Sequence, residues 1–272
     1  PSPARPAKRR RARGPAEPDQ RTREGRPELV VDRAPAGTGW TYPLWDEEQR
    51  CFSGHLRGAL GHGLARRFFK AVDEGVPWER TGPRWTAWMV RPPCSCAYGY
   101  GGMTVQPTHF PEWMEEIMAA CMPLCGLQEP STWPNSCNVN RYDSGWESVG
   151  WHADDEHLFQ GKYRDCLIIS LSLGQARTFE LRTWNCGGWR GKILLVGGDL
   201  CTMEGMMQRH YQHSAPKECD DPESMGPRIN LTWRWVVEHG RGCAAAGAGA
   251  RSPAGGRLGR GAAALASGQA AP

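Results

Sequence analysis

The chain has 272 residues, of which 39% are hydrophobic and 23% are charged, and its formal net charge is +4 at pH 7. This length allows one large domain or two small ones. No apolar run reaches the ~18 residues that a membrane-spanning helix needs, and the N-terminus lacks a signal-peptide pattern, so we expect no association with a membrane. The eleven cysteines lack the spacing of a disulfide framework, which favours a reducing compartment.

The charge is distributed unevenly along the chain. Residues 1–35 contain ten Lys/Arg and five Asp/Glu, and residues 241–272 contain four Arg and no acidic residue, so the middle of the chain carries −5. Both ends are rich in Pro, Gly or Ala and bury too little apolar surface to fold. We therefore predict a disordered basic tail over residues 1–36, one folded domain over residues 37–240 and a disordered Gly/Ala-rich tail over residues 241–272.

The basic cluster KRRRAR at residues 8–13 is compatible with three roles. It has the composition of a nuclear-import signal, it can add sequence-independent affinity for phosphates, or it is a solvated arm with neither role. The first reading predicts a nuclear protein that is also present in the cytoplasm.

The pattern of apolar residues predicts helices in the first half and strands in the second. Apolar residues recur every three to four positions from Phe52 to about Glu74, which indicates an amphipathic helix, and a second helix is predicted from Pro111 to Met122. Between them, PRWTAWMV is typical of a strand and PPCSCAYGYGG of a loop or hairpin edge. Short β-like runs follow at 137–142, 166–172, 177–183, 192–196, 199–203 and 228–237. Many short strands at such intervals predict a sandwich or barrel.

Three polar side chains in the second half are candidate metal ligands: His152, Asp154 and His213. Alternate residues of a strand point the same way, so His152 and Asp154 can reach one ion from one side. A second strand must supply His213. Two imidazoles and one carboxylate on one face leave three open positions, as a non-haem Fe(II) site with a cosubstrate and O₂ requires. A lone His-x-Asp, by contrast, is more often a surface turn.

The segment PRINLTWRW at residues 227–235 supports a charged ligand. Its Ile, Leu, Thr and Trp content predicts a strand. Arg228 and Arg234 are six residues apart and share one face of that strand. Two cations on a buried strand are costly without an anionic partner, so they indicate a dianion. The alternative is a structural salt-bridge pair.

The runs NVNRYDSGWESVGWHADDE, MEGMMQRHYQHSAPK and PRINLTWR resemble the AlkB family of Fe(II)- and 2-oxoglutarate-dependent dioxygenases. They look most like its eukaryotic branch, which removes alkyl groups from bases in DNA or RNA. PRWTAW and FPEWMEEI also match this branch, so the resemblance covers roughly residues 37–240. It implies a mainly β fold, the double-stranded β-helix or jelly roll, with two N-terminal helices on its outer face and a nucleotide-recognition lid.

The resemblance implies an iron site with three protein ligands. Fe(II) would be bound by His152, Asp154 and His213, with 2-oxoglutarate and O₂ as cosubstrates. In the family the second histidine ligand is followed by a small residue and Pro, which selects His213 over His210.

The resemblance also implies how 2-oxoglutarate is held. Its distal carboxylate would be bound by Arg228 and Arg234, since a planar guanidinium fork matches a carboxylate. Asn140 and Tyr142, two residues apart and therefore on one strand face, would be hydrogen-bonding partners, and Asn230 a weaker contact.

The substrate pocket is expected around Tyr98 and Tyr100, where the family carries aromatic residues on a lid hairpin. An enzyme that acts on a base must extrude it from a duplex or use single strands. We expect Tyr100 on one face of the base and the ring of His152 on the other. Asp155 and Glu156 would accept hydrogen bonds from an exocyclic amine or attract a cationic methylated base. The alternative is that both tyrosines are ordinary edge-strand residues and both acids are solvated.

Other polar residues have less specific interpretations. Arg177 and Arg182, in the run RTFELR, are candidate contacts to a phosphate or to the pocket. Cys94-x-Cys96 and Cys121-x₃-Cys125 have no matching second pair, so their spacing argues against a zinc site.

The function that the resemblance implies is oxidative demethylation of 1-methyladenine and 3-methylcytosine in DNA, RNA or both. Decarboxylation of 2-oxoglutarate would yield succinate, and the hydroxylated methyl group would leave as formaldehyde. The partner is then an alkylated nucleic acid, preferably single-stranded, and we expect a monomer with a role in DNA repair. The alternatives are an RNA N6-methyladenine demethylase, a protein or lipid oxygenase of the same family, and a non-catalytic nucleic-acid-binding protein.

Overall fold

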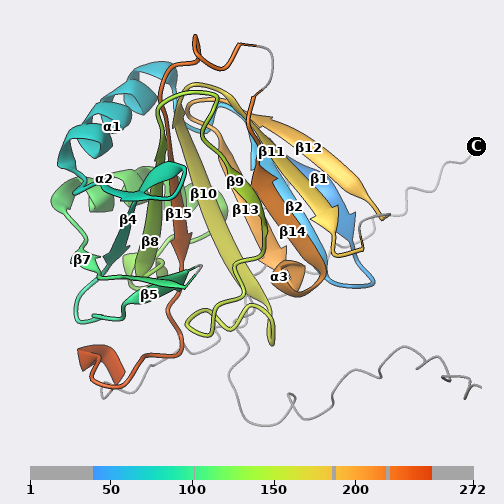
Figure 1. Cartoon of the computed structure of the whole chain (residues 1–272). Helices are drawn as coiled ribbons and strands as arrows, with labels where there is room; N and C mark the ends of the chain where they lie inside the picture. Colours follow the sequence, from blue (N-terminus) through green and yellow to red (C-terminus); the bar gives the residue numbers. More distant parts are fainter. Residues whose placement is uncertain (1–38, 101, 186–187, 219–220, 247–272) are drawn as a thin grey trace, which may run out of the picture.

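The computed structural model describes residues 39–100, 102–185, 188–218 and 221–246. They form two large sheets and a small hairpin, with two helices at one side (Figure 1). The predicted tail at residues 1–36, and the predicted C-terminal tail beyond residue 246, lie outside the described residues. Within those ranges, no helix has the length and apolar character to cross a membrane.

The larger sheet has nine strands. Eight of them are adjacent in the order β1-β2-β13-β10-β15-β8-β4-β3, and β7 pairs with β4. Pairing is antiparallel except between β4 and β7. The strands are β1 (Trp40–Asp46), β2 (Cys51–Leu56), β3 (Glu79–Thr81), β4 (Arg84–Val90), β7 (Thr108–His109), β8 (Ser136–Tyr142), β10 (Cys166–Gly174), β13 (Leu200–Gly205) and β15 (Arg228–Arg234).

The second sheet has four antiparallel strands in the order β12-β11-β14-β9. They are β9 (Val149–His152), β11 (Arg177–Thr183), β12 (Arg190–Leu195) and β14 (Tyr211–Ala215). Ile168 and Met203 of the larger sheet pack with Leu181 and Ile193 of the smaller one in a single apolar cluster. The two sheets therefore face each other across a shared core, as in a sandwich. A separate hairpin joins β5 (Tyr98–Tyr100) to β6 (Met103–Val105).

Two helices cover the outer face of the larger sheet (Figure 1). Helix α1 (His62–Gly75) buries Ala65, Phe68 and Val72, which are spaced as one helical face. They share an apolar cluster with the buried side chains of α2 (Glu112–Cys121) and with alternate residues of the central strands. The remaining short helices are the 3-10 turns Met122–Cys125, Pro130–Thr132 and Ala244–Ala246, and α3 (Met207–His210).

The central strand β15 is buried along its whole length, although its apolar residues alternate with polar ones. All seven of its residues are buried. Ile229, Leu231 and Trp233 belong to the cluster under the helices. The intervening residues point to the opposite face, because successive side chains of a strand alternate. That face lies toward the second sheet.

Gly174 ends β10 in a conformation that only glycine adopts easily. Its φ is +81°, and a Cβ at this position would collide with the Pro227 carbonyl oxygen just before β15. Glycine therefore allows the chains at the ends of β10 and β15 to approach closely.

The expectation of a mainly β fold with flanking helices is confirmed, but the predicted start of the first helix is wrong. Residues from Phe52 to Leu56 form strand β2, and α1 begins at His62. A four-residue spacing of apolar side chains is one-sided in a strand as well as in a helix, so Phe52 and Leu56 fit both. The strand forms because β2 lies between β1 and β13.

The packed part of the chain extends past the predicted boundary at residue 240. Cys243 is buried and the 3-10 helix Ala244–Ala246 follows it. Strand β1 is absent from the sequence-based assignment. His152 and His213 lie on two strands as expected, but β9 ends at His152, so the expectation that Asp154 shares its strand is wrong.

Candidate functional site

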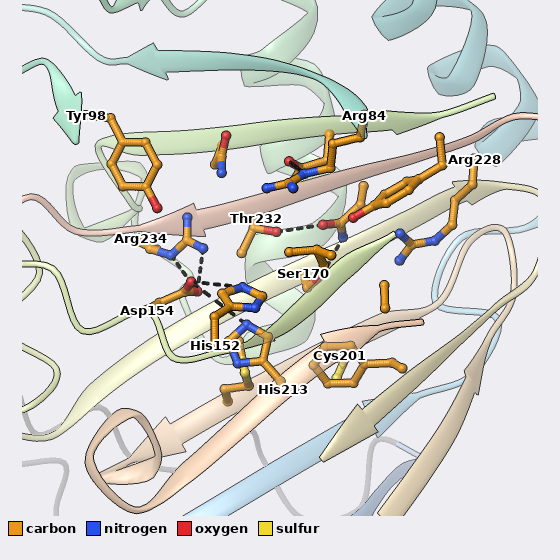
Figure 2. Close-up of a pocket in the computed structure, with 18 residues that line it drawn as sticks. Arg84, Tyr98, His152, Asp154, Ser170, Cys201, His213, Arg228, Thr232 and Arg234 are labelled. Carbon is orange, nitrogen blue, oxygen red and sulfur yellow. Dashed lines mark hydrogen bonds and ion pairs between the residues drawn. The ribbon is translucent and has the colours of Figure 1, made fainter. Parts of the chain in front are cut away.

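A pocket opens between the two sheets, and polar side chains line it (Figure 2). The larger sheet contributes even-numbered residues from its central strands, which are the positions opposite the helix-facing core. In β15 these are Arg228, Asn230, Thr232 and Arg234, and in β8 they are Asn138, Asn140 and Tyr142. The register holds them together, since Asn230 pairs with Asn140 and Arg228 with Tyr142.

The candidate metal ligands converge at one end of this pocket. His152 at the end of β9 is the cross-strand neighbour of His213 in β14, and their ring centroids lie 4.1 Å apart. The Nε2 atoms of His152 and His213 lie 3.7 and 3.9 Å from Asp154 Oδ1. The three side chains offer ligand atoms within 4.8 Å of one another. The nearby His210 does not line the pocket.

Hydrogen bonds set the ligand atoms in place. His152 Nδ1 lies 2.8 Å from the Gly150 carbonyl oxygen, so Nδ1 carries the proton and Nε2 is left as the metal-binding nitrogen. The Asp154 backbone N–H donates to Gln208 Oε1 at 2.9 Å. Arg234 Nε donates to Asp154 Oδ2 at 3.0 Å, and its Nη2 bonds to the same oxygen. One carboxylate oxygen is thus paired with the arginine while the other faces the imidazoles.

The electrostatics favour the protonation states that bind a metal. Burial alone would raise the pKa of Asp154, but Arg234 and the two imidazoles lower it well below its usual range. Burial, assisted by His152, lowers the pKa of His213 to about 3. At neutral pH the site therefore presents a carboxylate and a neutral His213 imidazole, as metal ligation requires.

The two arginines occupy different ends of the pocket (Figure 2). Arg234 pairs with Asp154, whereas Arg228 donates from Nη2 to Ser172 Oγ at 2.9 Å and lies 5.4 Å from the centre of the Tyr142 ring. This differs from the expectation that both bind one carboxylate. Arg228 Nε and Arg234 Nη1 are buried without a hydrogen-bond partner among the described residues. Each guanidinium thus retains one donor for an anionic ligand.

A hydrogen-bonded network fixes the amide side chains between the arginines. Asn230 Nδ2 donates to Ser170 Oγ at 2.6 Å, and Thr232 Oγ1 donates to Asn230 Oδ1 at 2.8 Å. Arg84 Nε donates to Asn140 Oδ1 at 2.9 Å. Sequence reasoning missed Arg84, Ser170 and Thr232. Arg84 stands in the run PRWTAW, where a buried arginine in a predicted strand was the available signal.

The residues predicted to contact substrate have separate environments. Tyr98 lines the pocket, is buried, stacks on Trp88 with centroids 4.9 Å apart and donates its hydroxyl to Glu156 Oε1 at 2.5 Å. Burial, followed by the charge of Asp154, raises the pKa of Glu156 to about 7. Asp155 points elsewhere and pairs with Lys162 at 3.0 Å.

The side chain of Tyr100 lies outside the described part of the structure, although its backbone belongs to β5. The packing of Tyr100 on a base therefore stays a prediction.

The two arginines of β11 are five residues apart, so they point to opposite faces of the smaller sheet. Arg177 is buried, and its guanidinium donates to the carbonyl oxygens of Ser144, Glu147 and Pro216. Its Nε lies 3.5 Å from Glu218 Oε1, and Arg177 does not line the pocket, so the contacts seen for this guanidinium are internal to the protein. The predicted contact with phosphate stays a prediction. Arg182 lies 4.2 Å above the ring of Trp151, the residue before His152.

Several known proteins are similar to this chain in sequence. A family model described as 2OG-Fe(II) oxygenase superfamily matches residues 63–234. The chain is 36% identical over 194 residues to alpha-ketoglutarate-dependent dioxygenase alkB homolog 3 of Bos taurus. The matched region covers 64% of this chain and 62% of the relative. It is 29% identical over 204 residues to DNA oxidative demethylase ALKBH2 of Arabidopsis thaliana, with 62% of each chain covered.

The chain spans about three fifths of the length of these curated relatives. Among solved structures, that of OsALKBH1 matches with a TM-score of 0.46 at 19% identity, covering 67% of this chain and 96% of the other.

Proposed function

The chain belongs to the 2OG-Fe(II) oxygenase superfamily, and from this premise we propose that it oxidatively removes alkyl groups from nucleobases in DNA or RNA. Membership makes it a dioxygenase that uses Fe(II) and 2-oxoglutarate. The finer proposal is that 1-methyladenine and 3-methylcytosine are its substrates, and that it acts in DNA repair in the nucleus. We also assign its two facing sheets to the double-stranded β-helix, with the β5–β6 hairpin as the nucleotide-recognition lid.

The proposal is carried by a facial ligand set that lies in one pocket with two buried arginines, each of which has one nitrogen without a hydrogen-bond partner among the described residues. His152, Asp154 and His213 have the donor set of a two-histidine, one-carboxylate iron site. We propose that they hold Fe(II). Bound there, Fe(II), 2-oxoglutarate and O₂ would supply the oxidation: 2-oxoglutarate would lose CO₂ and become succinate with one of the oxygen atoms, and the other would go to the alkyl carbon, so that the hydroxymethyl product releases formaldehyde.

The protein residues position these groups. Arg228, whose Nε has no partner among the described residues, is assigned to the distal carboxylate of 2-oxoglutarate, because a buried guanidinium favours a bidentate anion. Tyr142 lies beside it, and Asn140 and Asn230 line the path toward the metal. Arg234 is assigned to hold Asp154, and its unpartnered Nη1 is available to the cosubstrate end that binds the metal.

Support for a nucleobase comes from flat groups around His152. The imidazole of His152 and the ring of Tyr98 line the same pocket. Bases taken out of a helix are read by stacking between such groups and by hydrogen bonds to their edges. Glu156 Oε2 is buried and has no partner among the described residues, so it is assigned as an acceptor for the exocyclic amine. A relative at 29% identity is itself a DNA oxidative demethylase.

The test is a coupled product assay with the full chain, Fe(II) and 2-oxoglutarate. Single- and double-stranded DNA and RNA oligonucleotides would carry 1-methyladenine, 3-methylcytosine or N6-methyladenine. We expect formaldehyde in amounts equal to the methyl groups lost from the first two bases, with matching succinate. The His213→Ala variant and unmodified oligonucleotides are the controls.

The outcomes separate the alternatives. If only N6-methyladenine is demethylated, the substrate is N6-methyladenine and not 1-methyladenine or 3-methylcytosine. If succinate forms but no oligonucleotide loses a methyl group, a protein or lipid substrate is favoured. If the wild type makes neither succinate nor formaldehyde but still binds oligonucleotides, the protein is a non-catalytic binding module and the proposal fails.

A further inference from the structure

A second cluster of metal-binding side chains lies apart from the pocket. Cys94 and Cys96 are in the loop between β4 and β5, while His239 and Cys243 follow β15 near the end of the described chain. All four offer ligand atoms within 4.8 Å of one another. The three cysteines are buried and none forms a disulfide.

The spacing within this cluster is that of a tetrahedral metal site. The Sγ atoms of Cys94, Cys96 and Cys243 lie 3.7, 3.5 and 3.4 Å from His239 Nδ1. A tetrahedral zinc ion, with Zn–S of about 2.3 Å and Zn–N of about 2.0–2.1 Å, places its sulfur and nitrogen ligands about 3.5 Å apart. Hydrogen bonding does not account for the arrangement, because one imidazole nitrogen cannot serve three sulfurs at once.

Backbone amides support negative sulfur atoms in the cluster. The Ser95 N–H donates to Cys243 Sγ at 3.2 Å, and the Gly240 N–H donates to Cys96 Sγ at 3.4 Å. Such donors beyond the ligands stabilise thiolates bound to a metal and fix their orientation. The Ser95 amide of the loop bonds to a cysteine of the C-terminal segment, and the Gly240 amide of that segment bonds to a cysteine of the loop. The two segments are therefore held together by hydrogen bonds in both directions.

The donor set identifies the ion. Three thiolates and one imidazole are the ligands of structural zinc sites, which are closed by four protein ligands. The iron-type triad of the pocket instead has nitrogen and oxygen donors and open positions. We propose that Cys94, Cys96, His239 and Cys243 bind a structural Zn²⁺ ion that joins the loop before β5 to the segment after β15.

The location gives this zinc a defined effect on the substrate side. The Cys96 carbonyl oxygen accepts a hydrogen bond of 2.8 Å from Trp88 Nε1. Trp88 in turn stacks on Tyr98, the first residue of the β5–β6 hairpin. Zinc binding therefore anchors the base of the hairpin that carries Tyr98, and the C-terminal segment becomes part of that support.

The test is metal content by mass spectrometry of the full chain after treatment with a weak chelator. It uses the His213→Ala background, so that zinc in the pocket triad does not contribute. We expect about one zinc per chain, as a closed four-ligand site holds. Cys243→Ala and His239→Ala should reduce this at least tenfold, whereas Cys125→Ala, a buried cysteine outside the cluster, should retain it.

A second measurement requires no change to the cluster. Cobalt(II) added to the metal-free His213→Ala protein should give intense thiolate-to-metal charge-transfer and tetrahedral ligand-field bands, and one equivalent of Zn²⁺ should remove them. The proposal is overturned if the background protein holds no zinc and cobalt gives only the weak spectrum of a six-coordinate ion. It is also overturned if Cys125→Ala loses zinc as completely as Cys243→Ala. These results are independent of whether any oligonucleotide is demethylated.

Discussion

Replacing Arg228 by Gln should weaken 2-oxoglutarate binding without destabilising the ligand-free protein. Arg228 is 4% exposed, and burial lowers the pKa of its guanidinium although Tyr142 opposes this. The buried cation is therefore incompletely compensated before a ligand binds. In the complex its loss removes one partner of a buried charge pair, which costs about 2–5 kcal/mol. This corresponds to a roughly 30-fold to several-thousand-fold rise in Kd.

The matched variant is Arg234→Gln, whose main effect should be a loss of stability in the ligand-free protein. Asp154 is 2% exposed and Arg234 is its paired cation. Breaking a buried ion pair leaves an uncompensated charge, so the free energy of unfolding of the metal-free protein should fall by about 3–5 kcal/mol. A bound divalent ion restores part of this stability, because it neutralises the same carboxylate.

The assay is calorimetric titration of 2-oxoglutarate into Mn(II)-loaded protein without oxygen, together with urea unfolding of each variant. The assignment of separate roles is refuted if both variants raise the Kd equally while neither loses stability. It also fails if Arg228→Gln binds 2-oxoglutarate as the wild type does.

Three further predictions concern the ligands and the scaffold. His213→Ala should abolish succinate formation and the thermal stabilisation by Mn(II), measured by differential scanning fluorimetry. Burial would raise the pKa of Asp199, but hydrogen bonds from His55 and two backbone N–H groups lower it. The stability lost in Asp199→Asn should thus be largest above pH ~4, the usual Asp value, and shrink as the pH falls below it, as urea unfolding at several pH values would reveal. Gly174→Ala should cost about 1–3 kcal/mol in urea unfolding, because its φ is +81°. Gly63→Ala, with open space around it, should cost nothing.

The sequence predicted the inner face of the larger sheet well because a strand has a fixed period of two. Asn140 with Tyr142, and Arg228 with Asn230, are even-numbered residues of predicted strands, and the structure places all four on the pocket. Period alone does not give the direction in which a long side chain bends. Arg228 and Arg234 therefore share a face but have different partners, and only the fold brings Asp154 to one of them.

Local spacing failed where the partner lies far along the chain. Cys94 and Cys96 lack a nearby second pair, so their spacing argued against a metal. The missing ligands are His239 and Cys243, and the histidine lies 143 residues after Cys96. Strands β4 and β15 both pair antiparallel with β8, so they end at the same edge of the sheet and the segments that follow them meet. The same limit applies to Phe52, where a four-residue spacing was compatible with both a helix and a strand.

The two proposed metal sites use different donors, and this difference determines which ion each can hold. Zinc binds nitrogen and oxygen ligands more tightly than Fe(II) does, so the His152–Asp154–His213 cluster does not exclude zinc by affinity. Thiolates, however, prefer zinc strongly, and the Cys94–Cys96–His239–Cys243 cluster has no open position for a cosubstrate. If zinc binds first at the Cys94–Cys96–His239–Cys243 cluster, it stays at the site that supports the β5–β6 hairpin. The open pocket is then left to an ion that 2-oxoglutarate can chelate, with Arg228 as the counter-charge at the far end.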